Sequence, residues 1–505
     1  MHDLIEENIP DPTDEQQFII DTVRSTEENV MVVALAGTGK STTLMLMFVA
    51  DRRPIVLAGH AEAPTILCVA FNTRIVKDMT AKKDAWAKKL GIDLSHIEVR
   101  TLNGVGHRAW GSTISKKLVV DKDKTRNMLA SYIRDNLKGT DKEDAWSEVA
   151  NIRDAIASAK NKGYIPEGKF ENARHLITRE DFYDSLEEEL TPFTQKIVDH
   201  ILTESIKAAY NGLIDFDDQI YMSALFGGTF PRFPLVAIDE VQDLNAVNHE
   251  MLTKLAKGRL FGAGDDAQSI YAFRGAVPGS MAKLQKQFNM LECKLTNTFR
   301  CPEAVVRIAQ ARVPQYRSRK PGGTYAVLGS IAAREIRDNS AIICRNNAPL
   351  FGAAFNLLKA GRSVTVVGSD IGPRILAIMR KLGVEDTPRD RLEILIDRWL
   401  DEKLERAKNT ATVVDMAECM RVFASRGRTL GQAVAWAEDL FIQQGSITLI
   451  TGHKAKGLEW DVVYHLDPQL IRVDKDIQEA NLRYVITTRA KDSLYEIASD
   501  SIVWE

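Results

Sequence analysis

Residues 34–41, Ala-Leu-Ala-Gly-Thr-Gly-Lys-Ser, constrain the fold more than any other part of this sequence. The apolar run before them, residues 30–35, is typical of a buried strand, and the apolar residues 42–49 after them predict a helix. A glycine-rich turn between a strand and a helix directs backbone N–H groups and the helix N-terminus toward one point, where they bind phosphate. The sequence therefore predicts a phosphate-binding loop in an α/β fold.

The residues of this loop have distinct expected roles. Lys40 would reach the β- and γ-phosphate oxygens of a nucleotide, and the Ser41 hydroxyl would ligate Mg²⁺. The loop backbone and the first helical turn would cradle the phosphates; these residues are Ala36, Gly37, Thr38, Gly39 and Thr42. The pattern departs from the usual one only in Ala34, which stands where the first glycine is expected.

A second apolar run, residues 235–238, ends in two carboxylates, Asp239 and Glu240. A phosphate loop needs such an acidic strand end, with Asp239 holding the metal and Glu240 accepting a proton from the attacking water. Gln268 follows the next apolar run and is a candidate sensor of the γ-phosphate. Tyr271 and Phe273, beside Arg274, have the composition of a surface that stacks on unpaired bases; these three residues are candidate DNA contacts.

The amino-acid composition argues against several classes of protein. The 66 basic and 69 acidic residues leave a net charge of −3, so a nucleic-acid partner must be argued from local sites. The longest apolar runs fall far short of the ~20 residues that span a bilayer, and no membrane partner is expected. The five cysteines are never spaced Cys-x-x-Cys, which argues against disulfide, zinc and iron–sulfur frameworks. With an acidic N-terminus unlike a secretory signal, the sequence predicts a reduced, cytoplasmic protein.

The alternation of strands and helices predicts two α/β units, each interrupted by a mainly helical insertion. The expected first unit comprises residues 1–112 and 210–280, with its insertion at 113–209. The expected second unit comprises residues 281–369 and 446–505, with a reduced insertion at 370–445. The Gly- and Pro-containing residues 275–280 suggest the boundary.

Two of these motifs resemble the UvrD/Rep family of superfamily 1 DNA helicases. They are Asp-Glu-x-Gln-Asp at 239–243 and Gly-Asp-Asp-x-Gln-Ser-Ile-Tyr-x-Phe-Arg-Gly-Ala at 264–276, and the resemblance covers nearly the whole chain. Residues 13–17, Thr-Asp-Glu-Gln-Gln, are similar to the family's glutamine motif, which implies that Gln16 contacts the adenine edge. The segments 70–74 and 101–103 occupy the positions of DNA-contacting motifs, which implies DNA contacts by Phe71, Asn72 and Thr101.

The resemblance continues in the second half of the chain. Residues 295–300 are similar to the motif in which an aromatic residue, here Phe299, stacks on adenine and an arginine, here Arg300, reaches the γ-phosphate. Residues 451–460 resemble the motif in which Glu459 would hold the ribose and His453 would couple DNA to the nucleotide. Residues 483–490 resemble the terminal motif, which makes Arg489 the arginine finger. The implied fold is two RecA-like P-loop domains with parallel sheets.

The implied activity is that of an ATP-dependent DNA helicase or translocase with Mg²⁺ as cofactor, acting in repair or replication. It would move 3′→5′ on single-stranded DNA and open duplex at single-strand/double-strand junctions, because hydrolysis opens and closes a cleft between the two domains. One alternative remains open: an ATP-dependent DNA-bound switch, or an accessory subunit of a larger repair, recombination or defence complex, without processive unwinding. A fused nuclease is not expected, since few residues follow Arg489. The short second insertion predicts weak self-inhibition.

Overall fold

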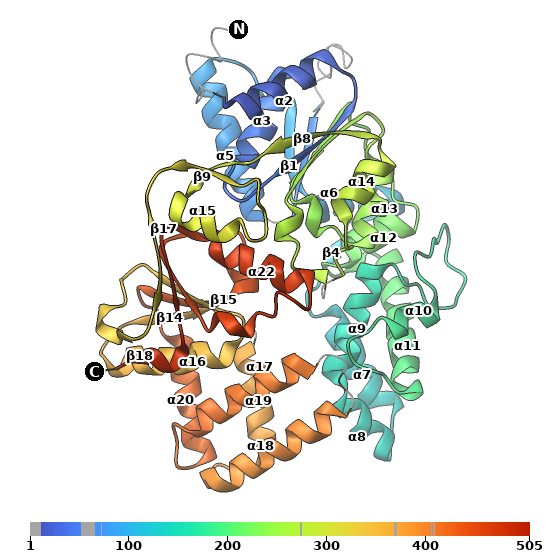
Figure 1. The fold of residues 1–505 in the computed structure, drawn as a ribbon. Helices are drawn as coiled ribbons and strands as arrows, with labels where there is room; N and C mark the ends of the chain where they lie inside the picture. Colours follow the sequence, from blue (N-terminus) through green and yellow to red (C-terminus); the bar gives the residue numbers. More distant parts are fainter. Residues whose placement is uncertain are drawn as a thin grey trace. The chain divides into compact units, whose positions relative to one another are not determined.

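The structure is a computed structural model that describes residues 12–51, 66–71, 73–272, 275–367, 371–405, 407 and 410–504. The chain divides into two compact units (Figure 1). The first comprises Met1–Ala34 and Gly39–Leu295, and the second Leu35–Thr38 and Thr296–Glu505. Each unit has its own six-stranded sheet and hydrophobic core, so each is described by itself.

The sheet of the first unit has the strand order β3-β2-β6-β7-β1-β8, and every neighbouring pair is parallel. Its strands are β1 (Asn29–Ala34), β2 (Ile66–Ala70), β3 (Ile97–Thr101), β6 (Leu235–Ile238), β7 (Arg259–Gly264) and β8 (Met290–Leu295). Successive residues of β1 enter different clusters: Met31 packs on one face, and Val30 and Val32 pack on the other. The sheet is therefore buried on both faces, as a parallel sheet requires.

Helices cover the two faces of this sheet. The cluster that contains Val30 and Val32 also contains residues of α2 (Asp14–Ser25), α3 (Lys40–Ala50) and α5 (Thr73–Leu90). The cluster that contains Met31 includes α6 (Leu102–Ile114), α12 (Asp218–Leu225), α13 (Ala246–Leu255) and α14 (Ser280–Gln287).

A helical insertion extends from this second face and shares its core. It contains the short parallel pair β4 (Val119–Val120) and β5 (Leu213–Ile214) and the helices α7 (Lys124–Asn136), α8 (Gly139–Ser147), α9 (Val149–Lys162), α10 (Arg179–Asp184) and α11 (Pro192–Tyr210). Trp110 of α6 is fully buried, and its indole N–H donates to the Ala209 carbonyl of α11 at 3.0 Å. The insertion is thus continuous with the sheet domain rather than separately packed.

The sheet of the second unit has the order β11-β17-β16-β13-β15-β14, again with all neighbours parallel. Its strands are β11 (Thr324–Leu328), β13 (Ala341–Cys344), β14 (Val364–Val367), β15 (Ile447–Thr451), β16 (Trp460–Leu466) and β17 (Ala490–Ile497). Two-stranded parallel pairs join β9 (Asn297–Pro302) to β10 (Arg317–Lys320) and β12 (Ile331–Ala332) to β18 (Ile502–Val503). The helices α15 (Glu303–Ala309), α16 (Asn347–Lys359), α21 (Gly452–Ala455) and α22 (Ile477–Thr487) connect these strands.

The second unit carries its own helical block, drawn in orange in Figure 1: α17 (Ile371–Leu382), α18 (Arg389–Leu404), α19 (Thr410–Ala424) and α20 (Leu430–Ile442). These helices pack on α16 and share one hydrophobic cluster with it. The Phe351 ring of α16 stacks on Phe423 of α19 at 5.0 Å and meets Phe441 of α20 edge-on at 5.5 Å. The block is therefore part of the core of this unit.

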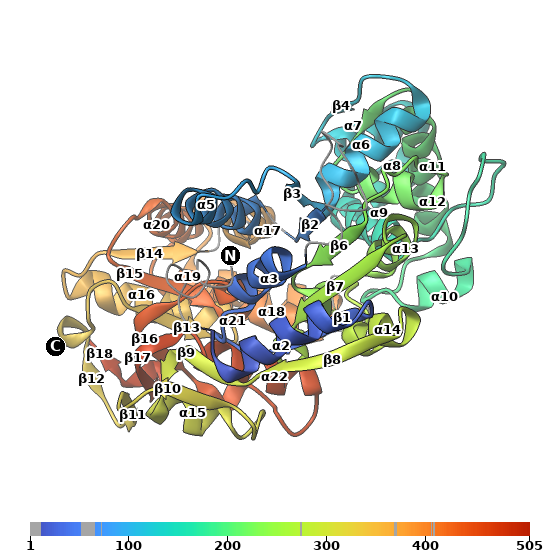
Figure 2. The same cartoon turned by 90° about the horizontal axis from the view of Figure 1, so that it is seen from above.

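The prediction of two parallel sheets with helical insertions is confirmed, but the expected boundary at residue 280 is wrong. The chain passes from the first unit to the second between Leu295 and Thr296. The reason is that β8 pairs with β1 along its whole length, from Asn29 opposite Met290 to Ala34 opposite Leu295 (Figure 2). Across the described residues, none of the helices combines the length and hydropathy needed to cross a membrane.

Candidate nucleotide site and nucleic-acid interface

The loop between β1 and α3 has the backbone that phosphate binding requires. Gly37 and Gly39 have φ angles of 70° and 88°, which residues with a side chain rarely adopt. Lys40 is the first residue of α3, so its side chain and the free N–H groups of the first helical turn lie at the same end of the helix. The local geometry is that of a strand–loop–helix anion site.

Lys40 meets the acidic end of β6. Its ammonium lies 3.0 Å from a Glu240 carboxylate oxygen and 3.9 Å from Asp239. Burial lowers the pKa of Lys40, but the carboxylates of Glu240 and Asp239 outweigh burial and raise it above its usual value. Burial also raises the pKa of Asp239 to about 6, although Lys40 opposes this. The structure thus brings together Lys40, Asp239 and Glu240, which lie about 200 residues apart.

The oxygen atoms beside Lys40 fit Mg²⁺. The Asp239 carboxylate is hydrogen-bonded by the Ser41 side chain, so the two groups predicted to hold the metal are neighbours. Within the described part of the chain, no group of three or more His, Cys, Asp or Glu residues could hold a metal ion by itself. Mg²⁺ typically takes one or two carboxylates together with phosphate oxygens and water, so a site with one carboxylate and one hydroxyl suits it.

A series of hydrogen bonds connects Glu240 to Gln268 through Gln242 and Asp265. Glu240 itself has a left-handed backbone with a φ of 57° and accepts a hydrogen bond from the Gln242 amide. The other end of the Gln242 amide accepts from the Asp265 N–H at 3.0 Å, and the Asp265 carboxylate accepts from Gln268 at 2.7 Å. Gln242 and Asp265 were not singled out from the sequence, although both lie inside the recognised motifs.

Two contacts position side chains on α3. The Gln16 amide donates to the Thr43 hydroxyl at 3.0 Å and its oxygen accepts from the Thr13 N–H at 3.1 Å, in a capping box at the start of α2. Lys82 of α5 donates to the Thr42 hydroxyl at 2.8 Å. The sequence gives no signal for Lys82, which is one lysine among several on a mixed-charge helix.

In the second unit, three predicted nucleotide residues lie close together. Arg300 donates to the Glu459 carboxylate at 2.6 Å. Arg489 is buried, and its guanidinium donates to the Val485 and Leu458 carbonyls at 2.8 and 3.1 Å. Burial, followed by the charge of Arg300, lowers the pKa of Arg489 to about 10, so it remains cationic at neutral pH.

Phe299 is 50% exposed, and the Arg319 guanidinium lies 5.5 Å from its ring centroid. An exposed ring at this position is available for stacking on a flat ligand.

The predicted DNA contacts fall at strand ends. Phe71 follows β2 and is 43% exposed, whereas Thr101 ends β3 and caps α6 by accepting from the Gly104 N–H at 3.0 Å. Tyr271 is partly exposed shortly after β7. His453 of α21 is partly exposed at the end of β15. The predicted contacts Asn72, Phe273 and Arg274 lie outside the described residues.

A buried ion cluster, Lys124, Lys160, Asp215 and Asp218, was missed by sequence analysis. Lys124 lies 2.6 Å from Asp218, and Lys160 lies 2.5 Å from Asp215 and 2.8 Å from Asp218. Burial alone would raise the pKa of Asp215, but Lys160 lowers it to about 2. No local pattern could have found this cluster, because its members come from α7, α9, α12 and the loop before α12.

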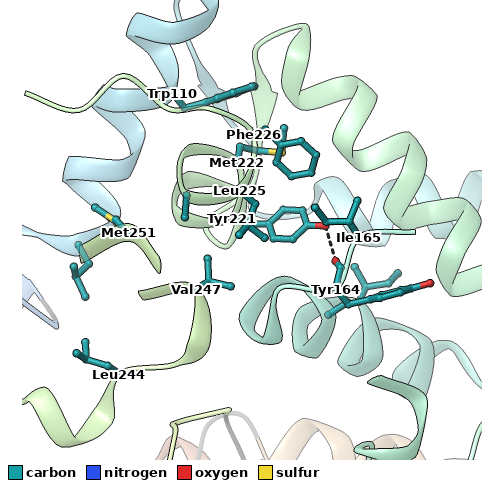
Figure 3. Close-up of a cluster of buried hydrophobic side chains, with 14 of the residues drawn as sticks. Trp110, Tyr164, Ile165, Tyr221, Met222, Leu225, Phe226, Leu244, Val247 and Met251 are labelled. Carbon is teal, nitrogen blue, oxygen red and sulfur yellow. Dashed lines mark hydrogen bonds between the residues drawn. The ribbon is translucent and has the colours of Figure 1, made fainter. Parts of the chain in front are cut away.

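Asp218 of the ion cluster lies on the same helix, α12, as Tyr221, which belongs to the hydrophobic cluster that joins the insertion to the sheet. Figure 3 shows part of that hydrophobic cluster. The Tyr221 ring of α12 lies among apolar side chains that include Val247, and its hydroxyl donates to the Tyr164 carbonyl at 2.6 Å. Tyr221 and Val247 are both almost fully buried. This arrangement ties α12 to the segment that follows α9 in the insertion and to α13.

Together, the loop, the Lys40–Glu240 pair and the two parallel sheets define the class of protein: a P-loop α/β protein built from two sheet units. The model of the UvrD/REP helicase N-terminal domain matches residues 14–289, and that of the UvrD-like helicase C-terminal domain matches residues 425–501. The chain belongs to the UvrD/Rep helicase family, as the sequence motifs predicted.

Two relatives illustrate the range of similarity. The ATP-dependent DNA helicase PcrA of Bacillus subtilis is 24% identical over 392 residues, which cover 69% of this chain and 49% of PcrA. The ATP-dependent DNA helicase UvrD2 of Mycobacterium bovis is 23% identical over 512 residues, which cover 86% of this chain and 70% of UvrD2. The chain therefore spans about half the length of PcrA.

Proposed function

We propose that this chain is an ATP-dependent DNA helicase that translocates 3′→5′ on single-stranded DNA and opens duplex at junctions. The observation that carries the proposal is the 3.0 Å pair between Lys40 and Glu240, which sets a phosphate-neutralising cation against a proton acceptor at the end of a parallel strand. The names of PcrA and UvrD2, both ATP-dependent DNA helicases, support the helicase part of this proposal.

The proposed chemistry is hydrolysis of the γ-phosphate by an activated water. Lys40 neutralises the phosphate oxygens, Glu240 accepts a proton from the water, and Gln268 senses the γ-phosphate through its link to Asp265. Ser41 and Asp239 would hold Mg²⁺, which when bound would supply charge neutralisation at the phosphates. Gln16 contacts adenine, and the loop residues predicted from the sequence cradle the phosphates.

The second unit contributes the remaining predicted nucleotide contacts. Phe299 stacks on adenine, Glu459 holds the ribose, and Arg300 and Arg489 stabilise charge on the γ-phosphate. In this proposal nucleotide binding closes the two units on each other and hydrolysis releases them, so each cycle moves a gripped strand. Phe71, Thr101, Tyr271 and His453 are the proposed contacts to that strand, together with Asn72, Phe273 and Arg274.

We also propose that residues 113–209 and 370–445 act as insertions that shape the DNA-binding surface. The shared core of the helices in 370–445 with α16 supports a fixed rather than a rotating second insertion.

The experiment that tests the function measures ATP hydrolysis and strand separation by the purified chain. We expect hydrolysis to rise strongly with single-stranded DNA and Mg²⁺, and 3′-tailed duplexes to be opened in preference to 5′-tailed ones. Hydrolysis without strand separation on any tailed duplex would favour the DNA-bound switch. Preferential opening of 5′-tailed duplexes would reverse the proposed polarity.

A further inference from the structure

The backbone of Glu240, the proposed proton acceptor, has an unusual conformation. Its φ and ψ angles are 57° and 44°, in the left-handed region that a glutamate rarely adopts. A residue keeps such a conformation only where the surrounding structure holds the chain on both sides of it. On one side, the Glu240 N–H donates to the Asp239 carboxylate at 2.9 Å. On the other side, the chain enters the short 3-10 helix Val241–Asp243, which is held from outside.

The hydroxyl of Ser280 holds this short helix. It donates to the Val241 carbonyl at 2.6 Å, across 39 residues of sequence. Ser280 is the first residue of α14 and is almost fully buried, so water does not compete for this hydrogen bond. The hydroxyl therefore ties the residue that follows Glu240 to a helix from another part of the first unit.

His249 of α13 sets the direction of the Ser280 hydroxyl. Its Nε2 atom lies 2.8 Å from the Ser280 oxygen. A serine hydroxyl has a single proton, and here that proton is donated to Val241, so Nε2 must carry a proton and donate to the serine oxygen. Burial, followed by the charge of Lys283, lowers the pKa of His249 to about 4, so the ring is neutral at neutral pH. The contacts thus select one tautomer, with the proton on Nε2.

This tautomer leaves Nδ1 of His249 unsatisfied. Nδ1 is buried and has no hydrogen-bond partner among the described residues. An unpaired buried acceptor is unfavourable, and an apolar ring of similar size would avoid it. The feature that His249 provides and an apolar ring does not is therefore the Nε2–H donor to Ser280.

The helix that carries His249 is firmly anchored. Val247 and Met251 of α13 belong to the hydrophobic cluster of Figure 3, and both are almost fully buried. A capping box between Asn245 and Asn248 fixes the start of the same helix. The hydrogen bonds through His249 thus begin at a rigid element and end at the turn beside Glu240.

We propose that Ser280, oriented by His249, is a positioning residue that holds Glu240 where it accepts the proton of the attacking water. Both side chains act through the Val241 backbone. The proposal rests on the proposed function, since it assumes that Glu240 is the proton acceptor. A displaced proton acceptor slows the chemical step, whereas ATP binding through Lys40 and the phosphate loop is retained.

The test measures kcat and KM for DNA-stimulated ATP hydrolysis by the full chain, with kcat expressed per folded molecule from circular dichroism. Ser280→Ala should lower kcat roughly tenfold and leave the KM for ATP within about twofold of its original value. Ser280→Thr keeps the hydroxyl and should retain more activity than Ser280→Ala. His249→Phe removes only the donor and should lower kcat by a smaller factor, because Val241 still accepts from Ser280.

Ser223→Ala is the matched control. Ser223 is fully buried in the same unit, and its hydroxyl donates at 2.8 Å to the Gln219 carbonyl of its own helix rather than to the turn after Glu240. This variant loses the same atom and should keep its kcat. A kcat in Ser280→Ala equal to that of the control would overturn the proposal, and an unchanged kcat in His249→Phe would overturn the part assigned to His249.

A double substitution separates positioning from a general structural effect. In a chain that already carries Glu240→Gln, Ser280→Ala should cause no further loss of the residual single-turnover rate, because no proton acceptor is left to position. A further loss of the same size as in the unchanged chain would overturn the proposal. Normal hydrolysis by Glu240→Gln alone would instead overturn the proposed function, since Glu240 would not be the proton acceptor.

Discussion

The buried ion cluster gives a prediction whose size follows from its contacts. Asp218 accepts from Lys124 at 2.6 Å, lies 2.8 Å from Lys160 and also accepts from the Asp215 N–H at 2.9 Å. In Asp218→Asn both lysines lose a carboxylate contact, and Lys124, whose printed ion pair is with Asp218, keeps only its hydrogen bond to the Ser205 carbonyl, so its charge is left buried without an ion-pair partner among the described residues. Breaking a buried ion pair in this way costs about 3 to 5 kcal/mol.

A loss of this size lowers the thermal midpoint of a unit this large by roughly 5 to 15 °C. The measurement is thermal unfolding followed by far-ultraviolet circular dichroism, with limited proteolysis to assign the transition to the first unit. Asp217→Asn is the matched control, because the neighbouring Asp217 carboxylate makes no hydrogen bond within the described residues. A midpoint in Asp218→Asn equal to that of the control would refute the argument.

The remaining predictions concern chemistry, metal binding and packing. Lys40→Ala and Glu240→Gln should each reduce DNA-stimulated ATP hydrolysis by orders of magnitude. Glu240→Gln should still bind ATP in a filter assay. Near-normal turnover in either variant would show that ATP is hydrolysed at another site. Because the pKa of Asp239 is raised to about 6, the carboxylate is protonated below that pH and Mg²⁺ must displace a proton. The apparent Mg²⁺ affinity, measured calorimetrically with a nucleotide analogue, should therefore fall about tenfold per pH unit below 6, and a flat profile between pH 5 and 7 would contradict this. Phe423→Ala should lower the free energy of unfolding of the second unit by about 3 to 5 kcal/mol in denaturant, because the ring is fully buried against Phe351. The control Ile394→Ala, at an exposed position, should change the free energy of unfolding by less than about 0.5 kcal/mol. Equal effects of the two substitutions would show that the second helical block is not part of that core.

Local sequence was enough to predict the phosphate loop and the acidic strand end. Gly37 and Gly39 have positive φ angles that residues with a side chain rarely adopt. The strand before them is apolar because both faces of the sheet are covered. The same search for apolar runs did not find β8, so the boundary between the units was placed too early. Its residues, such as Glu292 and Lys294, are exposed because β8 is an edge strand, so the run lacks the continuous hydrophobicity of the central strands.

The parts of the site that escaped prediction depend on long-range contacts. The pairing of Lys160 with Asp215 and Asp218 is visible only once α9 meets α12 and the loop before it. The sequence likewise does not distinguish Asp217, which makes no capping hydrogen bond at α12, from Asp215 and Asp218, which form ion pairs with Lys160. Charge pairing between distant elements is set by the fold, and a single sequence carries no direct record of it.

The position of β1 in its sheet, between β7 and the edge strand β8, has a consequence for synthesis on the ribosome. Its partners β7 and β8 begin only at Arg259 and Met290, so more than 200 residues must be translated before either strand exists. At ordinary elongation rates this takes on the order of 10 to 45 s, during which an apolar strand and the phosphate loop behind it have no native neighbours. Late-closing parallel pairs of this kind slow folding and expose aggregation-prone edges. The nascent first unit is therefore expected to be a client of ribosome-associated chaperones, and a release from the ribosome before Leu295 should yield insoluble chains.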